Sequence, residues 1–214
     1  MTMRMNKYLW ALCAVLALPV QAAVPANCDG EGTDTIRATT PTARFHLPQG
    51  YDVVVDKETG LLWARCPLGF RLERGACEVV SGEQRLFSWR GALEAVAVFR
   101  ANDPLGSGYT DGWHLPNVKE LASIIERQCR DPALNGAVFP THPSGYYWTS
   151  TPVAQISAGA ADDVWEERVW AVGTTNGGVT PIPKGDPTDP TTQRAYVLPV
   201  RELTDSEFQD WLSR

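Results

Sequence analysis

The amino-acid sequence predicts an α+β fold with small antiparallel sheets, two main helices and long loops, stabilised by disulfides. A pair of strand-like stretches comes first, two helical stretches follow, and several further strands come last, which is the segregated order of an α+β domain. Four cysteines remain beyond the first 22 residues, and this even number predicts two disulfides. With 214 residues, the chain is long enough to bury one core of ordinary size.

The first 22 residues have the pattern of a signal peptide. Arg4 and Lys7 supply the positive start, and residues 8–20 are apolar but too few for a comfortable membrane span. Ala22 offers a small residue at the cleavage point. The mature protein is therefore expected to be exported, to the periplasm, the cell surface or the medium, with no membrane span of its own.

The charge that remains after this cleavage disfavours polyanionic partners. Loss of Arg4 and Lys7 leaves 17 of the 19 basic side chains against 25 acidic ones, a formal charge of about −8. Nucleic acids and anionic surfaces reward the opposite balance. We therefore expect no nucleic-acid partner, although several arginines fall between residues 65 and 100 and could form a local basic patch.

The mature chain divides into three predicted parts. Residues 23–50 are rich in Thr, Pro and Gly without periodicity, and are expected to form an extended lead-in. Residues 51–203 contain the strands and helices of the domain. Residues 204–214 are expected to form a short C-terminal helix, with Thr204 as its N-cap.

Spacing favours one of the three possible pairings of the four cysteines. Cys66 and Cys77 are eleven residues apart and enclose turn-forming residues, which suits a small closed loop. Cys28 would then pair with Cys129 and fasten the lead-in beside the end of the second helix. A metal site at these cysteines would need closer spacing and nearby histidines.

The first strands of the domain form a predicted hairpin. Residues 51–55 are largely β-branched, residues 56–60 have the composition of a turn, and residues 61–63 return as the second strand. A further short strand is expected at residues 78–80, after the disulfide loop.

A first helix is predicted from Ser88, its expected N-cap, to Arg100. Residues at helical spacing form an apolar stripe that should face the core: Trp89, Ala92, Leu93, Val96 and Phe99. A loop rich in Gly, Asp and Pro follows at residues 102–112.

A second helix is predicted to begin at Asn117. Glu120 lies three residues further on, which is the spacing of a capping box. We expect this helix to end near Arg130, since the pair Asp131-Pro132 disfavours continuation. Its core-facing side carries Leu121, Ile124 and Ile125.

The last third of the chain predicts strands joined by long loops. The aromatic residues 146–150 and the alternating residues 168–172 indicate two strands, and a tight-turn signal at residues 176–178 leads to Val179. The final strand is expected at residues 195–201. Long loops should lie at residues 154–167 and 181–192.

Several short motifs occur along the chain in one order. They are Asp56, Thr59, Gly60 and Trp63; Trp89 with Ala92-Leu93; Trp113, Leu115, Pro116, Glu120 and Leu121; Phe139-Pro140; Tyr147, Trp148, Thr149 and Ser150; Trp170; and Tyr196 to Arg201. In this register the chain resembles the DUF1566 family, also called the Lcl C-terminal domain after a bacterial collagen-like adhesin, over roughly residues 53–201. His114 departs from the family's motif, which usually has Arg between the Trp and the Leu.

The resemblance implies a C-type-lectin-like fold in an exported bacterial protein. In that fold the terminal strands pair, two helices pack on the sheet, and long loops contain any ligand site. The namesake adhesin binds glycosaminoglycan-like polysaccharide, but the loops at residues 154–167 and 181–192 lack the clustered Arg and Lys that a sulfated glycan requires. Five tryptophans of the motifs are expected to be mainly core: Trp63, Trp89, Trp113, Trp148 and Trp170.

An enzymatic alternative also follows from resemblance, because formylglycine-generating enzymes have a similar Trp-x-Leu-Pro corner. Those oxidases use a pair of late cysteines, and this sequence has none after Cys129. Nucleophilic catalysis would need a Ser or Cys beside a base, and the three histidines, His46, His114 and His142, occur in no such pattern. We therefore expect no enzyme, no catalytic residue and no cofactor.

A ligand face is predicted in the acidic loop after Trp148, which contains Asp162, Asp163, Trp165 and Glu166. An exposed Trp can stack on a sugar, and the carboxylates could bind calcium; a solvated acidic loop is the simpler alternative.

The sequence thus predicts an exported, non-enzymatic domain that binds a glycan or a surface protein through its long loops. The alternatives are a structural or assembly component of a cell-surface appendage and, less favoured, a formylglycine-generating-type enzyme.

Substitution Trp165→Ala tests the predicted ligand face. We expect the variant to fold normally and to lose binding, because the aromatic surface for stacking is removed. A glycan array and a partner pull-down, each run beside the wild type, measure the change. Unchanged binding to every glycan and partner would exclude Trp165 from the ligand face.

Overall fold

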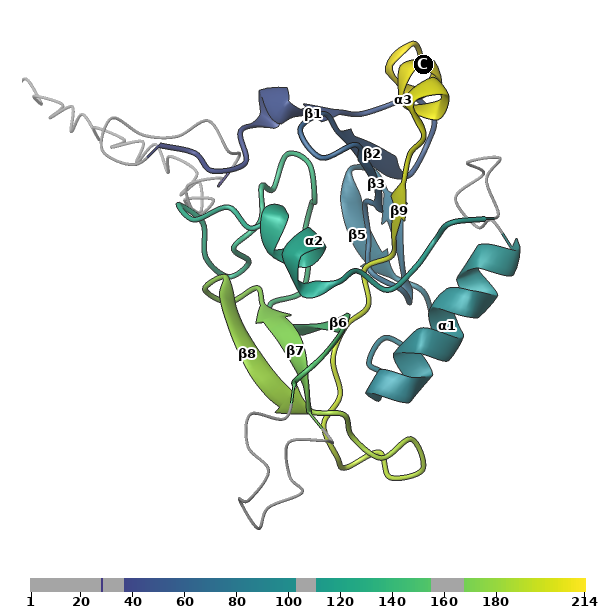
Figure 1. Ribbon diagram of the computed structural model, residues 1–214, viewed down its shortest axis with the longest axis vertical. Coiled ribbons are helices and arrows are strands. Elements are labelled where there is room, and N and C mark those ends of the chain that lie inside the picture. Colours follow the sequence, from purple (N-terminus) through teal and green to yellow (C-terminus); the bar gives the residue numbers. More distant parts are fainter. Residues whose placement is uncertain (1–27, 29–36, 103–110, 155–167) are drawn as a thin grey trace, which may run out of the picture.

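Three antiparallel sheets and three α-helices make up the described part of the computed structural model (Figure 1), which confirms the α+β class. The structure describes residue 28 and residues 37–102, 111–154 and 168–214. The elements in chain order are η1 (Thr42–Arg44), β1 (Phe45–His46), β2 (Val53–Asp56), β3 (Leu61–Ala64), β4 (Phe70–Glu73), β5 (Ala76–Val79), α1 (Trp89–Asn102), α2 (Val118–Ser123), β6 (Tyr146–Pro152), β7 (Arg168–Gly173), β8 (Gly178–Pro183), β9 (Val200–Glu202) and α3 (Asp205–Leu212). None of the described helices is long and apolar enough to cross a membrane.

The first sheet has the strand order β1-β2-β3-β9 and joins the two ends of the domain. Trp63 on β3 lies opposite Val200 on β9, so the C-terminal strand pairs with the predicted β2–β3 hairpin. The expected strand at residues 195–201 was too long, since β9 begins only at Val200. Ala195 instead makes a bridge with Phe87, which holds this part of the chain away from β3.

The turn between β2 and β3 is organised by a buried carboxylate, Asp56. Arg44 donates from Nε to Asp56 Oδ1 at 2.7 Å, and the Thr59 hydroxyl donates to Oδ2 at 2.7 Å. Gly60 closes the turn by donating its N–H to the Asp56 carbonyl at 2.9 Å, with a positive φ of 69°. A buried charge needs such partners, which explains why Asp, Thr and Gly occur at this spacing.

The chain between Cys66 and Cys77 differs from its predicted form. A small closed loop was expected, but β4 and β5 pair as a hairpin, with Phe70 opposite Val79. Arg74 and Gly75 form the turn and both have positive φ, the combination that suits a two-residue hairpin connection. The predicted Cys66–Cys77 disulfide is confirmed, with a Cα–Cα distance of 5.6 Å.

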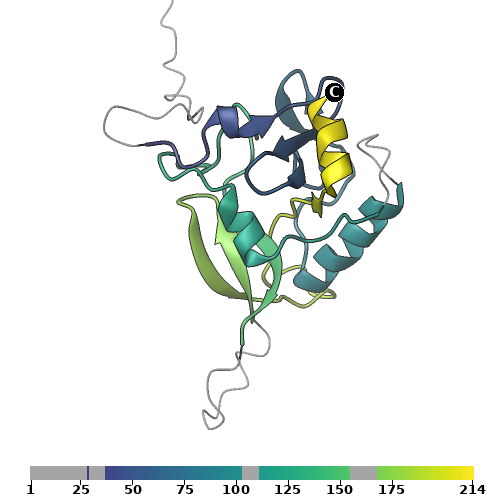
Figure 2. The ribbon, with the colours of Figure 1, turned by 45° about the horizontal axis from the view of Figure 1, so that its top comes forward.

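Helix α1 begins as predicted, because the Ser88 hydroxyl accepts the N–H of Gly91 at 3.2 Å. Its buried stripe is narrower than predicted and consists of Ala92 and Val96. Leu93 is 39% exposed, while Trp89 and Phe99 are half-buried. The helix lies along the outer side of the molecule in both views (Figures 1 and 2), so only one narrow line of residues reaches the core.

Helix α2 has the predicted capping box but ends much earlier than predicted. Asn117 accepts from the N–H of Glu120 at 3.0 Å, and Glu120 accepts from the N–H of Asn117 at 2.6 Å. The helix ends at Ser123 instead of near Arg130, because Ile125 pairs with Leu134 in an antiparallel bridge. The three predicted core residues of this stretch are buried: Leu121, Ile124 and Ile125.

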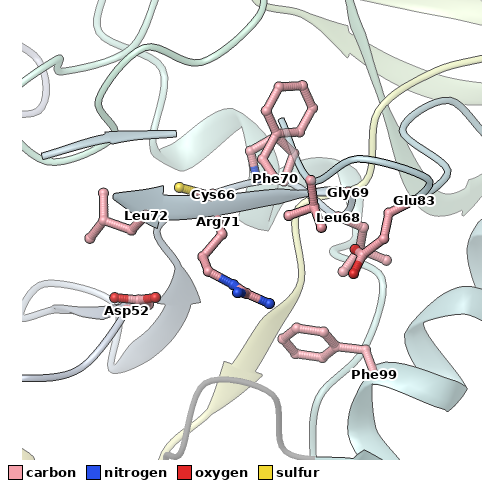
Figure 3. A pocket seen from close by; sticks show the side chains of 11 residues that line it. Asp52, Cys66, Leu68, Gly69, Phe70, Arg71, Leu72, Glu83 and Phe99 are labelled. Atoms are coloured by element: carbon pink, nitrogen blue, oxygen red, sulfur yellow. The ribbon is translucent and has the colours of Figure 1, made fainter. Parts of the chain in front are cut away.

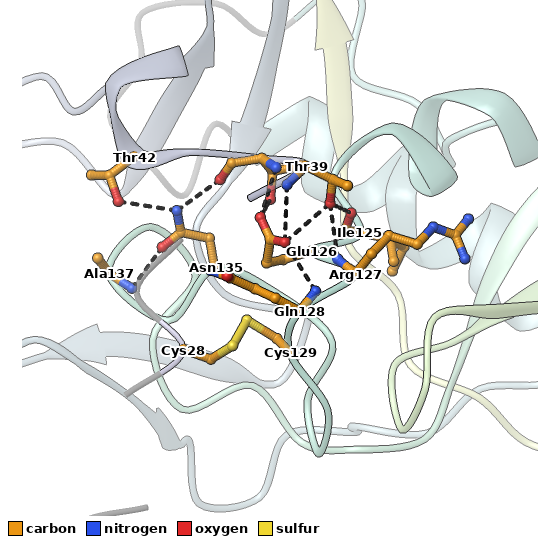
Figure 4. Close-up of a disulfide and its surroundings, with 11 residues drawn as sticks. Cys28, Thr39, Thr42, Ile125, Glu126, Arg127, Gln128, Cys129, Asn135 and Ala137 are labelled. Carbon is orange, nitrogen blue, oxygen red and sulfur yellow. Dashed lines mark hydrogen bonds between the residues drawn. A yellow bond between two sulfur atoms is a disulfide. The ribbon is translucent and has the colours of Figure 1, made fainter. Parts of the chain in front are cut away.

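Glu126, just beyond α2, fastens the N-terminal lead-in (Figure 4). Its buried carboxylate accepts the backbone N–H groups of Thr39 at 3.0 Å, Thr40 at 2.7 Å and Gln128 at 3.1 Å. The predicted disulfide between Cys28 and Cys129 is also confirmed, with a Cα–Cα distance of 5.4 Å. The Cys28–Cys129 disulfide and the buried Glu126 carboxylate therefore both fasten the lead-in.

The second large sheet, β6-β7-β8, packs around Trp148. The Trp148 indole is buried and donates to the carbonyl of Phe87 at 2.7 Å. Strand β8 runs on through Pro181 and Pro183, which were expected in a loop; as an edge strand it tolerates prolines that cannot donate to a neighbour.

The tryptophans divide differently from the prediction. Trp63, Trp113 and Trp148 are buried as expected, whereas Trp89 and Trp170 are only half-buried. An unexpected member of the core is Trp211 on α3, whose ring lies 5.1 Å from that of Tyr51 in an edge-to-face contact.

Substitution Glu126→Gln is expected to lower the free energy of unfolding by about 2 kcal/mol, because an amide cannot accept this set of N–H donors as a carboxylate does. Burial alone would raise the pKa of Glu126, but the hydrogen bonds from Thr39, Thr40 and Gln128 outweigh it and lower the pKa. The stabilisation is therefore complete above pH 4.5, the ordinary value, and is lost as the pH falls through the lowered pKa of the folded state.

Urea unfolding with the disulfides intact, at pH 7 and at acid pH, measures both effects. Glu78→Gln, on the exposed side of β5, is the matched control and should change little. Equal stability of the wild type and Glu126→Gln at pH 7 would contradict the proposed role of the carboxylate.

Candidate functional site

A groove between the start of α1 and the β8–β9 connection is the largest concave surface among the described pockets. It has a volume of about 880 Å³ and lies on one of the two long loops that the sequence singled out. Figure 1 shows this connection returning toward the N-terminal end of α1. The lining residues are Trp89, Arg90 and Leu93 from α1, and Pro183, Lys184, Gly185, Asp186, Pro187, Thr192 and Gln193 from the connection.

Backbone hydrogen bonds fix the two walls of the groove against each other. The N–H of Trp89, the first residue of α1, donates to the carbonyl of Lys184 at 2.8 Å. Phe87 and Ala195 exchange two backbone hydrogen bonds of 3.0 Å. The beginning and the end of the connection are therefore both attached to the chain that leads into α1.

Trp89 provides an oriented aromatic surface in this groove. Its indole N–H donates to the carbonyl of Thr149 at 2.9 Å, which fixes the plane of the half-buried ring. Leu93 lies one helical turn further on and adds an exposed aliphatic surface. The Lys184 ammonium lies 5.1 Å from the centre of the Trp89 ring, within the range of a cation–π interaction.

The connection contains the tripeptide Asp-Pro-Thr twice in succession, at residues 186–188 and 189–191. Each Asp accepts from the Thr two residues later: Asp186 Oδ1 lies 2.7 Å from the N–H of Thr188, and Asp189 Oδ1 lies 2.9 Å from that of Thr191. The hydroxyls of the same threonines donate to these carboxylates as well, and these side-chain hydrogen bonds lower the pKa of both aspartates. The loop is therefore a pair of linked turns with anionic side chains.

The groove combines an apolar surface with polar groups of both kinds. Arg90 and Lys184 are cationic, Asp186 is anionic, and Thr192 and Gln193 add a hydroxyl and an amide. The described lining residues include no cysteine, histidine or serine.

The ligand face predicted from the sequence lies elsewhere in the chain. Asp162, Asp163, Trp165 and Glu166 are outside the described residues, and their role stays a prediction. Within the described ranges, no group of three or more His, Cys, Asp or Glu side chains is placed to hold a metal ion.

The residues of the sequence motifs mostly form the framework and not the groove. Trp113 and Leu115 are buried, and the carbonyl of Pro116 accepts the N–H of Ser150 at 2.8 Å, which links the corner to β6. Trp89 and Leu93 are the motif residues that also line the groove. The sequence did not indicate that Lys184 and Gln193 line a groove. Their position beside α1 depends on the bridge between Phe87 and Ala195, which are far apart in sequence.

The three histidines occupy separate structural positions. His114 Nδ1 lies 2.8 Å from the Gly112 carbonyl, and its Nε2 lies 3.2 Å from Glu120 Oε1. His142 is buried and donates from Nε2 to the Arg65 carbonyl at 2.8 Å; burial lowers its pKa to about 4, so it is neutral at pH 7. His46 belongs to β1.

Comparison with known families gives one clear match. The model of the Lcl C-terminal domain matches residues 52–201, well over half of the chain. A search of curated proteins returns no significant match.

The pair His114–Glu120 gives a test of the corner. The hydrogen bond that His114 donates to Glu120 raises the pKa of His114 more strongly than burial lowers it. The pair therefore stabilises the fold fully below pH 6.5, the ordinary value, and this contribution is lost as the pH rises through the raised pKa. We expect Glu120→Gln to lower the pKa of His114. An NMR titration of the His114 ring protons measures this change.

The control is Glu202→Gln, since Glu202 acts on His114 only through its charge and is the weakest contributor to the shift. It should lower the pKa of His114 less than Glu120→Gln does. A His114 pKa that is the same in Glu120→Gln and in the wild type would contradict the role given to the pair.

Proposed function

The chain belongs to the Lcl C-terminal domain family, and we propose that it is an exported, non-enzymatic domain that binds a glycan in the groove between α1 and the β8–β9 connection. The observation that carries this proposal is the oriented Trp89 ring beside Leu93, on the floor of a groove with charged and amide groups around it. A sugar ring has an apolar face of C–H groups and a rim of hydroxyls. Such a ligand would contact the Trp and Leu with its face and the polar groups with its rim.

The size and charge of the groove support a neutral or weakly charged oligosaccharide. Its volume of about 880 Å³ is within the range of small-molecule sites and exceeds what one sugar ring needs. Arg90 is already paired with Glu94, with Nε 3.0 Å from the carboxylate, and Asp186 adds a negative charge. A densely sulfated chain would require a stronger excess of positive charge than these side chains provide.

A C-type-lectin-like architecture is part of the same proposal. It is supported by the pairing of β3 with β9, which brings the two ends of the domain together, and by two main helices beside the sheets. The groove then lies on a long connection before the last strand, where the resemblance expects a ligand site.

Export and the absence of catalysis are proposed on the basis of the cysteines. All four cysteines beyond residue 22 are in disulfides, which form in oxidising compartments. A formylglycine-generating-type oxidase would need reactive thiols, and these four are not available for that chemistry.

A structural or assembly role in a cell-surface appendage is the second candidate. The observation that favours it is the exposure of two aliphatic residues on different sides of α1, Leu93 at 39% and Val98 at 61%. Exposed aliphatic residues on one helix suit a protein partner better than a sugar.

A glycan array with the variants Leu93→Arg and Val98→Arg separates the two candidates. Both residues are exposed on α1, but only Leu93 lines the groove, so we expect Leu93→Arg alone to weaken glycan binding at least about tenfold, or ~1.4 kcal/mol. The array is run with and without calcium, and circular dichroism checks the fold of each variant. Glycan binding unaffected by Leu93→Arg would overturn the groove, and a partner lost only in Val98→Arg would favour the assembly role.

A further inference from the structure

A second, smaller pocket lies between the β4–β5 hairpin, the chain before β2 and the C-terminal part of α1 (Figure 3). None of its lining residues belongs to the groove described above. Its volume of about 120 Å³ is several times the share of one water molecule, about 30 Å³, but below the range of about 300–1,000 Å³ typical of larger ligands. The pocket therefore suits a small molecule.

One side of this pocket is apolar. Phe99 contributes its ring from α1, Leu68 and Leu72 come from the hairpin region, and Val80 follows β5. The Phe99 ring is held in place by an edge-to-face contact with buried Trp113, with ring centres 5.4 Å apart. These side chains could cover an aliphatic group of a ligand.

Charged side chains of both signs face the same space. In Figure 3, Arg71 points from β4 into the pocket toward Phe99, and Asp52 lies on the same side of the strand. Within the described residues, neither the Arg71 guanidinium nor the Asp52 carboxylate makes a hydrogen bond or an ion pair, although the two act on each other electrostatically. Each therefore retains its full capacity to bind a ligand group.

Asp52 is half-buried and lies near two arginines. Burial raises the pKa of Asp52, and the positive charges of Arg65 and Arg71 only partly oppose that effect. The half-buried carboxylate stays in contact with solvent and accepts no hydrogen bond from a donor in the described residues. An ammonium group of a ligand would supply one.

The frame around the pocket is rigid. The Cys66–Cys77 disulfide closes the base of the hairpin, and Leu68 donates its N–H to the Val197 carbonyl at 2.8 Å. Gly69, with φ of 81°, lies so close to the Gln84 carbonyl that a Cβ there would be 2.4 Å from its oxygen. These contacts therefore fix the backbone that carries Leu68 and Arg71.

We propose that this pocket binds a free α-amino acid with an apolar side chain. The carboxylate of the amino acid would pair with Arg71, its ammonium with Asp52, and its side chain would lie against Phe99 and the neighbouring aliphatic residues. Glu83, at the other side of the pocket, adds a second anion and disfavours acidic amino acids.

Isothermal titration of the full mature protein with leucine tests the proposal. Leucinamide lacks the carboxylate and N-acetylleucine lacks the ammonium, so each should bind at least tenfold more weakly than leucine. Cadaverine, a diamine, tests whether Asp52 and Glu83 instead form a site for cations. Tighter binding of cadaverine or leucinamide than of leucine, or no saturable leucine binding at millimolar concentration, would overturn the assignment.

Variants on the hairpin provide the second measurement. Arg71→Ala and Asp52→Asn are expected to weaken leucine binding at least tenfold, whereas Arg74→Ala, an exposed arginine at the hairpin turn outside the pocket, should stay within twofold of the wild type. Leu93→Arg in the groove should leave leucine binding unchanged, so this test is independent of glycan binding. Equal losses in Arg71→Ala and Arg74→Ala would overturn the role of Arg71.

Discussion

The pairing of β3 with β9 is the constraint on which the rest of the structure depends. Leu61 opposite Glu202 and Trp63 opposite Val200 bring residues that are far apart in sequence into one ladder. The chain between β3 and β9 leaves this sheet after Ala64 and returns to it at Val200. The β8–β9 connection must therefore pass close to the start of α1 on its way back, and that passage creates the groove.

Helix α1 links the two candidate sites because each uses one of its ends. Trp89 lines the groove and Phe99 lines the smaller pocket. Ten residues separate them, which corresponds to about 15 Å along a helix. The narrow buried stripe of Ala92 and Val96 leaves the remaining faces of α1 available for both sites.

Contacts between residues that are close in sequence were predictable, whereas most contacts between distant residues were not. The capping box at Asn117, the N-cap at Thr204 and the Cys66–Cys77 disulfide follow from spacing and are present, whereas Cys28–Cys129, which spans 101 residues, was expected as the pairing that remains. The early end of α2 follows from the Ile125–Leu134 bridge, and Glu126 beside it binds Thr39 and Thr40, more than 80 residues away in sequence. The groove likewise depends on a bridge between segments that are distant in sequence, so only Trp89 and Leu93 among its residues belong to a sequence motif. Arg74-Gly75 indicated the turn between Cys66 and Cys77, but not the strands on either side of it.

The repeated Asp-Pro-Thr turns have a consequence for the thermodynamics of recognition. Pro187 and Pro190 restrict the backbone before any ligand arrives, and the aspartate–threonine hydrogen bonds hold the turns in one form. A loop that is already ordered loses little conformational entropy when it closes on a ligand. If the groove binds a sugar as proposed, even a modest set of contacts would then give useful affinity.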